Sequence, residues 1–269
     1  MDLSGKVAVI TGGASGLGGA TAEHFVHDKG MRVAIFDIDE MAGQAMAHRL
    51  GAGHARFWKV DVADEDVVET AAAEVAAHFG RIDICINAAG IPAVMRIVER
   101  DGRPSQGALF RRTLMVNLAG TFHVMSHCAA WMARNEPGRS GERGAVVNIA
   151  SIAAFEGMIG HGAYAASKAG IVGLALPAAR EFARIGVRVN TIAPGLFETP
   201  MAGEVRDAVI RSLAAMYEFP QRLGEPAEFV ALCVHLCENA YINGECIRID
   251  AAMRIGGNNV PRRAAPRHP

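Results

Sequence analysis

The sequence predicts a three-layer α/β fold in which helices cover both faces of a doubly wound, seven-stranded and mainly parallel sheet. Short apolar runs alternate with amphipathic segments along nearly the whole chain, and a glycine-rich turn follows the first apolar run. With 269 residues, of which 51% are hydrophobic, the chain is long enough to bury a large core. No linker interrupts the pattern, so we expect a single domain over residues 1–255.

The first half of the chain alternates regularly between strand and helix patterns. Residues 7–10 are an unbroken apolar run, which is typical of a strand buried on both faces. Gly51 and Gly80 follow two helical patterns, as glycine commonly does just beyond a helix C-terminus. The predicted strands are 6–10, 32–36, 55–60 and 82–86, and the predicted helices are 17–29, 40–50 and 65–79.

The second half opens with a predicted loop over 87–106, helices over 107–134 and a polar turn over 135–144. Glu225-Pro226 predicts a further helix start, because proline at the first helical position removes an N–H that has no partner there. The remaining predicted elements are strands at 145–149, 187–192 and 245–249 and a long helix at 163–185.

Gly12, Gly16 and Gly18 lie in the turn between the first strand and the first helix. Glycines at this spacing let the chain turn tightly, let a pyrophosphate approach the backbone and let the helix pack on the strand. The helix N-terminus adds free amide groups and the positive end of its dipole. Asp37 ends the second strand, where a carboxylate can bind a ribose hydroxyl and repel a 2′-phosphate. Because Ser15 rather than arginine precedes Gly16, the pattern predicts NAD(H) rather than NADP(H).

Ser151, Tyr164 and Lys168 form a second pattern with chemical meaning. Tyr164 and Lys168 are four residues apart on one predicted helix, so their side chains share a face. The pKa of a phenol is about 10, and we expect the neighbouring cation to lower it toward working pH. Tyr164 can then exchange a proton with the oxygen of an alcohol or ketone, while the Ser151 hydroxyl hydrogen-bonds the same oxygen.

Together with these two patterns, motifs from the glycine turn to Asp250 resemble the short-chain dehydrogenase/reductase family. The resemblance implies a Rossmann-type fold, a nicotinamide cofactor and catalysis by Ser151, Tyr164 and Lys168. It also implies that Asn117 holds a water that connects Lys168 to solvent. The residues that match cofactor-binding positions of the family are Gly12, Ser15, Gly16, Leu17, Gly18, Asp37, Asp61, Val62, Asn87, Ala88, Gly90, Tyr164, Lys168, Pro194, Gly195, Phe197 and Thr199.

More narrowly, residues 153–157, 193–200, 219–228 and 243–250 resemble the type 2 3-hydroxyacyl-CoA dehydrogenase branch, which is 17β-hydroxysteroid dehydrogenase type 10-like. The resemblance implies NAD-dependent oxidation of short or branched 3-hydroxyacyl-CoA in lipid metabolism, some activity on hydroxysteroids, and a homotetramer. Two residues depart from the branch. Ala251 stands where glycine usually follows the aspartate, and His161 replaces a residue that is commonly glutamine.

Two other functions stay open at this point. One is a biosynthetic reductase of 3-oxoacyl thioesters, but such enzymes commonly prefer NADPH, and Asp37 and Ser15 argue against that cofactor. The other is a non-catalytic nucleotide-binding scaffold, against which the complete trio of Ser151, Tyr164 and Lys168 argues.

The substrate side is predicted less closely, because an apolar cleft suits an acyl chain and a steroid equally. His161 is either part of an exposed loop or a contact to a polar group of the substrate. The arginines of the insert 96–112 either lie on a solvated loop or bind the phosphates of a coenzyme A tail. The candidate substrate residues are Ser151, Phe155, His161, Leu196, Met201 and Phe219.

Composition excludes several other classes. A net charge of −1 gives no surface for nucleic acid, and the longest apolar run, 169–179, is too short to span a membrane. Five cysteines without framework spacing suggest the cytoplasm. His123 and His127 are four residues apart but lack further ligands, so no metal is expected. Residues 256–269, rich in arginine and proline, are expected to be a flexible basic tail.

Overall fold

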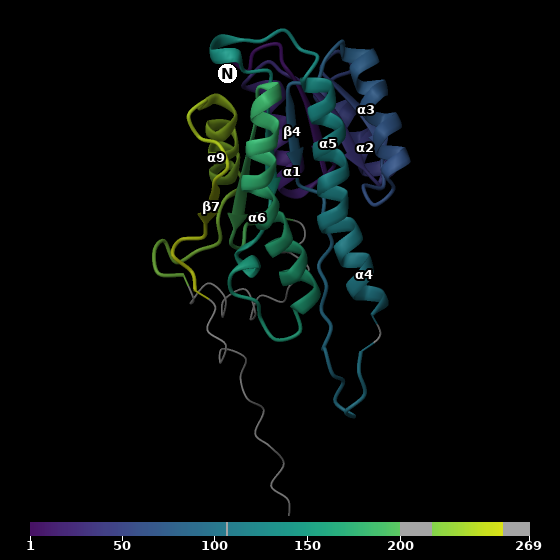
Figure 1. Ribbon diagram of the computed structural model, residues 1–269, viewed down its shortest axis with the longest axis vertical. Coiled ribbons are helices and arrows are strands. Elements are labelled where there is room, and N and C mark those ends of the chain that lie inside the picture. The colour runs from purple at the N-terminus through teal and green to yellow at the C-terminus, as the bar shows by residue number, and fades with distance from the viewer. Residues whose placement is uncertain (106, 200–216, 255–269) are drawn as a thin grey trace, which may run out of the picture.

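Seven strands form one sheet in the order β3-β2-β1-β4-β5-β6-β7 (Figure 1), and every neighbouring pair is parallel. The computed structural model describes residues 1–105, 107–199 and 217–254. The predicted tail therefore lies outside the described residues, as does Met201. The strands are β1 (Val7–Thr11), β2 (Arg32–Asp37), β3 (Ala55–Lys59), β4 (Ile84–Asn87), β5 (Gly144–Ile149), β6 (Val187–Pro194) and β7 (Cys246–Ile249).

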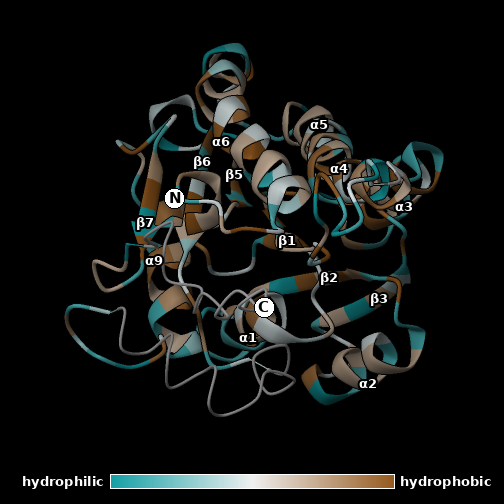
Figure 2. Ribbon diagram, turned by 90° about the horizontal axis from the view of Figure 1, so that it is seen from below, coloured by the Kyte–Doolittle hydropathy of each residue, from teal (hydrophilic) through white to brown (hydrophobic). Residues whose placement is uncertain are grey.

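Helices cover both faces of this sheet (Figure 2), which confirms the predicted three-layer arrangement. One face carries α3, α5 and α6 and the other carries α1, α2 and α9, and each face has its own buried apolar core. The helices are α1 (Gly16–His27), α2 (Glu40–Leu50), α3 (Glu65–Phe79), α4 (Ala108–Leu114), α5 (Gly120–Met132), α6 (Gly162–Phe182) and α9 (Pro226–Glu238).

The predicted elements are confirmed, and their boundaries shift by a few residues. Pro226 opens α9 inside a reciprocal capping box between Glu225 and Glu228. The stretch predicted as helical from 107 to 134 contains a π-helical turn, Met115–Ala119, between α4 and α5. Short 3₁₀ turns occupy Arg139–Gly141, Ile152–Ala154 and Ala183–Ile185. No described helix is both long and apolar enough to cross a membrane.

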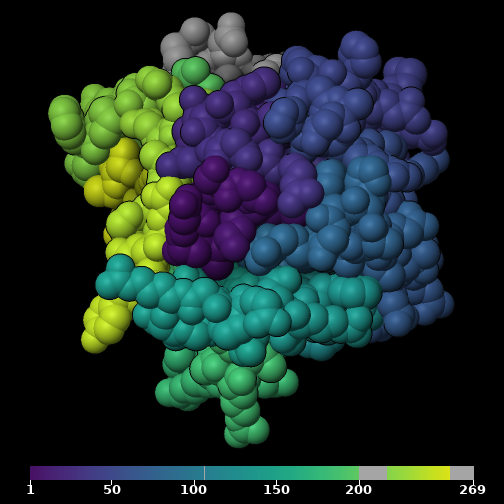
Figure 3. Space-filling view, turned by 90° about the horizontal axis from the view of Figure 1, so that it is seen from above, coloured from purple at the N-terminus to yellow at the C-terminus, as the bar shows by residue number. Residues whose placement is uncertain are grey.

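The N-terminus lies at the end of the sheet where the strands begin (Figure 1), and the first residues of the chain are visible on the surface at that end (Figure 3). The Met1 ammonium donates to the Glu238 carbonyl oxygen at 2.7 Å and lies 3.4 Å from the Glu142 carboxylate. At the opposite end, the chain leaves β1 and β4 in opposite directions across the sheet, because β4 lies on the other side of β1 from β2. In open parallel sheets, ligands bind in the crevice at this reversal, beyond the carboxyl ends of the strands.

Candidate functional site

The glycine turn after β1 is shaped by two close backbone approaches. A Cβ on Gly12 would lie 3.0 Å from the Ala89 nitrogen, and Gly12 has φ +63°. A Cβ on Gly18 would overlap the carbonyl oxygen of Gly12, so α1 can pack this closely on the turn only with glycine there. Gly16 has φ +57° and open space where a side chain would project. The turn therefore leaves room for a phosphate against its backbone.

The first turn of α1 leaves its amide groups available. Ser15 is the N-cap residue, yet its side chain makes no capping hydrogen bond, and the first turn contains no acidic side chain. Leu17 packs against the apolar core and so anchors this end of the helix. Free N–H groups and the positive end of the helix dipole suit an anionic ligand.

Asp37 ends β2 beside the same turn. One carboxylate oxygen accepts a hydrogen bond from the Ala14 N–H at 3.2 Å, and the other accepts from the Asp39 N–H at 3.1 Å. These contacts hold a negative charge at the edge of the glycine turn, where it can accept hydrogen bonds from a sugar hydroxyl.

Beyond β3, Asp61 and Val62 occupy different environments. The Asp61 side chain is exposed and accepts from the Ala63 N–H at 3.0 Å, whereas Val62 is buried against Gly120 of α5. The neighbouring His123 and His127 lie 3.9 Å and 3.5 Å from the Glu65 carboxylate. No cluster among the described residues has the composition of a metal site.

The end of β4 connects the glycine turn to the other half of the sheet. Asn87 is buried and donates to Asn148 of β5 at 2.9 Å, while the Thr11 hydroxyl accepts from the Ala89 N–H at 3.0 Å. Ala88 forms the backbone that approaches Gly12. A Cβ on Gly90 would lie 3.5 Å from the Lys168 ammonium. The predicted cofactor cradle and the predicted catalytic lysine are thus adjacent.

Ser151, Tyr164 and Lys168 converge at the carboxyl edge of the sheet. Ser151 follows β5 and its hydroxyl accepts from the Ala153 N–H at 3.1 Å, which fixes it at the start of a 3₁₀ turn. Tyr164 lies in the first turn of α6, and Lys168 lies one turn later. The Lys168 ammonium lies 5.8 Å from the centre of the Tyr164 ring and donates to the Ile149 carbonyl oxygen at 2.7 Å.

The expected lowering of the Tyr164 pKa by Lys168 is wrong for this structure. Burial raises the pKa of Tyr164, and a hydrogen bond with Ser151 opposes that shift. Burial also lowers the pKa of Lys168 to about 8, because loss of water disfavours the charged form of this residue, which is only 4% exposed. Loss of contact with water is therefore the largest cause of the pKa shift of both groups.

Asn117 lies in the π-helical turn and is completely buried. Its Oδ1 accepts from the Ile91 N–H at 2.8 Å, and its Nδ2 donates to the Ile91 carbonyl oxygen at 3.1 Å and to the Ser167 hydroxyl at 3.0 Å. Asn117 thus joins the segment after β4 to the helix of Tyr164 and Lys168. Its role in a water-mediated proton relay stays a prediction.

Comparison with known proteins decides the family. Residues 6–209 match the family described as short chain dehydrogenase. The chain belongs to the short-chain dehydrogenase family. The 3-hydroxyacyl-CoA dehydrogenase type-2 of Homo sapiens is 46% identical over 94% of this chain and 97% of its own length. That of Drosophila melanogaster is 42% identical over 94% and 99%. The crystal structure of 3-hydroxyacyl-CoA dehydrogenase type-2 from Mycobacterium avium has a TM-score of 0.89 at 42% identity, and the match covers 95% of this chain and 99% of that one.

The chain is therefore an oxidoreductase acting on CH–OH groups, and its family generally uses a nicotinamide cofactor. In this short-chain dehydrogenase, β6 ends at Pro194 and the Gly195 N–H still donates to Ile249 of β7 at 2.9 Å. The Phe197 ring is buried edge-on against Phe229 with ring centres 6.0 Å apart. The ring of Phe197 therefore belongs to the core. Thr199, the last described residue of this segment, is half-buried.

The candidate substrate residues that the structure describes lie near a loop and include three apolar side chains. Phe155 and Leu196 are partly exposed, and Phe219 is 85% exposed. The Met95 N–H donates to the Gly160 carbonyl oxygen at 2.8 Å, so the loop over 91–105 is attached to the segment that contains His161. The His161 Nδ1 is buried without a hydrogen-bond partner among the described residues.

Two residues that the sequence argument missed support this region. The Tyr217 hydroxyl contacts both polar groups of the Leu196 backbone, at 2.9 Å to the N–H and 3.3 Å to the carbonyl oxygen. Arg248 of β7 donates to Glu156 and Asp250, each at 2.7 Å. Arg248 has a signal in the sequence, because an arginine inside a short strand indicates that its charge has a partner nearby. No spacing in the sequence indicates the contact of Tyr217.

Proposed function

We propose that this dehydrogenase interconverts a secondary alcohol and a ketone with NAD as cofactor, and that its main substrate is a 3-hydroxyacyl-CoA, with hydroxysteroids as further substrates. The observation that carries the proposal is the position of Lys168 beside Gly90, which brings the catalytic trio next to the glycine cradle. The names of the relatives supply the substrate class.

The residues suit this chemistry. When bound, the nicotinamide accepts a hydride from the substrate carbon. Tyr164 removes the hydroxyl proton, and Ser151, which also interacts with Tyr164, orients the substrate oxygen. Lys168, anchored on Ile149, lies beneath the phenol ring and supplies positive charge when it is protonated. In the reverse direction the neutral Tyr164, whose pKa is raised by burial, returns the proton to the ketone oxygen.

NAD rather than NADP is supported by Asp37. Its carboxylate is fixed beside the glycine turn by the Ala14 and Asp39 N–H groups. A 2′-phosphate at this position would meet a negative charge that the backbone already holds in place. The same observation argues against the alternative of an NADPH-dependent 3-oxoacyl thioester reductase. A non-catalytic scaffold has no need of the Ser151–Tyr164–Lys168 arrangement.

The loop over 91–105 supports a coenzyme A substrate. Arg96 and Arg100 are exposed on it, and its hydrogen bond to Gly160 attaches it to the segment that contains His161. It extends beyond the carboxyl ends of the strands (Figure 1). Exposed guanidinium groups bind phosphates well, and a coenzyme A tail carries several.

His161 is proposed to contact a polar group of the substrate. His161 precedes Tyr164 by three residues, and its Nδ1 has no hydrogen-bond partner among the described residues. It lies in the segment that is hydrogen-bonded to the loop over 91–105, which we call the arginine loop. A His161→Gln variant with unchanged KM and kcat on every substrate would remove this part of the proposal.

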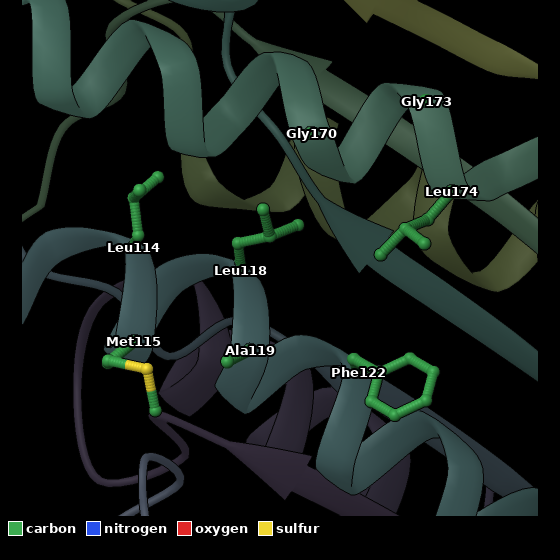
Figure 4. A pocket seen from close by; sticks show the side chains of 8 residues that line it. All are labelled: Leu114, Met115, Leu118, Ala119, Phe122, Gly170, Gly173 and Leu174. Carbon is green, nitrogen blue, oxygen red and sulfur yellow. The ribbon is translucent and has the colours of Figure 1, made fainter. Parts of the chain in front are cut away.

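We propose that further copies of this chain bind the outer face of α4, α5 and α6 and that the assembly is a homotetramer. An apolar hollow of about 380 Å³ lies there, and Met115 and Phe122 are 46% and 47% exposed beside it. Figure 4 shows Leu114 and Leu118 directed toward α6, where Gly170 and Gly173 have no side chain. Light scattering should give four times the mass of the chain, and Phe122→Asp should lower it. A cytoplasmic location completes the proposal, supported by five free cysteines.

The experiment follows NADH formation by purified protein. We expect the highest kcat/KM with 3-hydroxybutyryl-CoA, a lower value with its N-acetylcysteamine thioester, which lacks the coenzyme A phosphates, and a lower value again with a 17β-hydroxysteroid. NADP⁺ should replace NAD⁺ poorly. A preference for the steroid would overturn the substrate, equal use of both cofactors would overturn the role of Asp37, and equal rates on both thioesters would remove the arginine loop from substrate binding.

A further inference from the structure

The backbone just beyond β6 needs a partner that the sheet does not supply. Gly195 still donates to Ile249 of β7, but the pairing of β6 and β7 ends there. The Leu196 carbonyl oxygen accepts from the Gly224 N–H at 3.0 Å. The Leu196 N–H points instead to the Tyr217 hydroxyl at 2.9 Å.

Tyr217 occupies both polar groups of this one residue. Its hydroxyl accepts from the Leu196 N–H and donates to the Leu196 carbonyl oxygen at 3.3 Å. A Cβ on Gly195 would lie 3.5 Å from the same hydroxyl, so the phenol lies directly against the Gly195–Leu196 segment. The Tyr217 side chain therefore holds this backbone together with the hydrogen bonds to Ile249 and Gly224.

The ring of Tyr217 is anchored independently of its hydroxyl. It is only 2% exposed and belongs to a small apolar cluster with Ile152 and Met253. Ile152 directly follows Ser151, so the ring packs against the turn that holds the candidate catalytic serine. The Glu218 N–H donates to the Ala251 carbonyl oxygen at 3.2 Å, which fixes the next residue as well.

Burial raises the pKa of Tyr217, the hydrogen bond with the Leu196 backbone lowers it, and the charge of Asp250 raises it further. The hydroxyl thus keeps its proton at neutral pH and can donate and accept together. This behaviour suits a fixed structural contact and does not suit a second acid or base.

We infer that Tyr217 is a positioning residue that holds the Gly195–Leu196 backbone in place for the nicotinamide end of the cofactor and connects it to the turn of Ser151. The inference rests on the proposed function and on the sequence-based expectation that Pro194, Gly195 and Phe197 contact the cofactor. Tyr217 itself touches neither the reacting atoms nor the adenosine half of the site, which is built on β1 to β4.

The test compares NADH with ADP-ribose, which lacks the nicotinamide, in binding titrations. Tyr217→Phe keeps the ring in its cluster and removes both hydrogen bonds to Leu196. Loss of the hydrogen bonds that hold the Leu196 backbone should weaken NADH binding by about tenfold, while ADP-ribose binding stays unchanged. The matched control is Tyr241→Phe, the same change at a side chain that is 99% exposed, and both ligands should bind it as they bind the wild type.

Thermal unfolding of both variants confirms that they are folded before binding is compared. Equal NADH affinity in Tyr217→Phe and wild type would overturn the inference alone. Equal weakening of NADH and ADP-ribose would also overturn it, because a general loss of structure would then explain the effect. A wild-type protein that binds neither ligand would overturn the proposed cofactor, and the inference with it.

Discussion

The two halves of the sheet build the site by different means. In the half formed by β1 to β4, the site is shaped mainly by the backbone. Gly12 and Gly18 permit approaches that any side chain would block, and Ser15 leaves the amides of α1 free. In the half formed by β5 to β7, buried side chains position the backbone, because Lys168 and Tyr217 both donate hydrogen bonds to backbone carbonyl oxygens.

This difference explains what each half tolerates. A backbone cradle depends on the absence of atoms, so adding one methyl group damages it. A network of buried side chains depends on the presence of particular atoms, so removing one hydroxyl or charge damages it and leaves the fold intact. The variants below add atoms to the first half or remove them from the second.

The largest effect is expected at Tyr164. Tyr164→Phe removes the only proposed proton-transfer group, and general acid–base catalysis typically contributes about 10²–10⁴-fold. The variant should lose nearly all turnover while it binds NADH as the wild type does, because the cradle lies on other elements. Steady-state kinetics and an NADH titration measure the two properties. Retention of more than about a tenth of the wild-type kcat would show that the mechanism is wrong.

The next effect is expected at Gly18, where a side chain would overlap the Gly12 carbonyl oxygen. Gly18→Ala should push α1 away from the turn, weaken NADH binding by about tenfold or more and destabilise the fold by about 1–3 kcal/mol. Gly53→Ala is the matched control, because a Cβ at Gly53 meets nothing within 4 Å. If Gly18→Ala and Gly53→Ala bind NADH equally well, backbone shape does not determine the cradle.

How far the sequence predicts each half follows from the same difference. Glycine spacing carries the steric requirement of the cradle directly, so Gly12, Gly16, Gly18 and Asp37 are found where they were expected. The strands are also readable, because parallel strands buried on both faces are continuous apolar runs. The order of the strands in the sheet was not predicted and comes from the structure alone.

The side-chain network is less readable because its contacts cross long stretches of sequence. Ser151, Tyr164 and Lys168 could be named from spacing, but the direction of the Tyr164 pKa could not, since it depends on burial. Asn117 lies in a π-helical turn, and the hydrophobic periodicity of the sequence does not predict that turn. Tyr217 contacts Leu196 across 21 residues, and that contact exists only in the folded chain.

A pH-dependent effect on stability is expected at Lys168. Its folded-state pKa is about 8, below the ordinary 10.5, so the folded chain binds this proton less tightly than the unfolded chain. The lysine's contribution to stability is complete above about 10.5 and is lost as the pH falls through about 8. From pH 7.5 to 10, wild type should gain about 1–3 kcal/mol over Lys168→Met in urea unfolding. Lys59→Met, at an exposed site, is the control. A constant difference between wild type and Lys168→Met would contradict the burial argument.

The smallest effect is expected at Arg248, which joins β7 to the loop after Ser151 by its contacts with Glu156 and Asp250. Arg248→Met keeps the apolar stem but leaves both carboxylates to Arg254, which lies farther away, at 3.5 Å and 3.4 Å. Because the ion pairs are only partly buried, the stability loss should be modest, about 1 kcal/mol. The loop beside Phe155 should become more mobile, which should raise the KM for the alcohol about threefold. The KM for NAD⁺ should stay constant, and this difference would assign Arg248 to the substrate side.

Lys29→Met, which breaks the ion pair with Glu238, is the matched control. If Arg248→Met instead raises the KM for NAD⁺, the two halves of the site are coupled through β7. The half on β1 to β4 and the half on β5 to β7 would then not act separately, as their contacts indicate that they do.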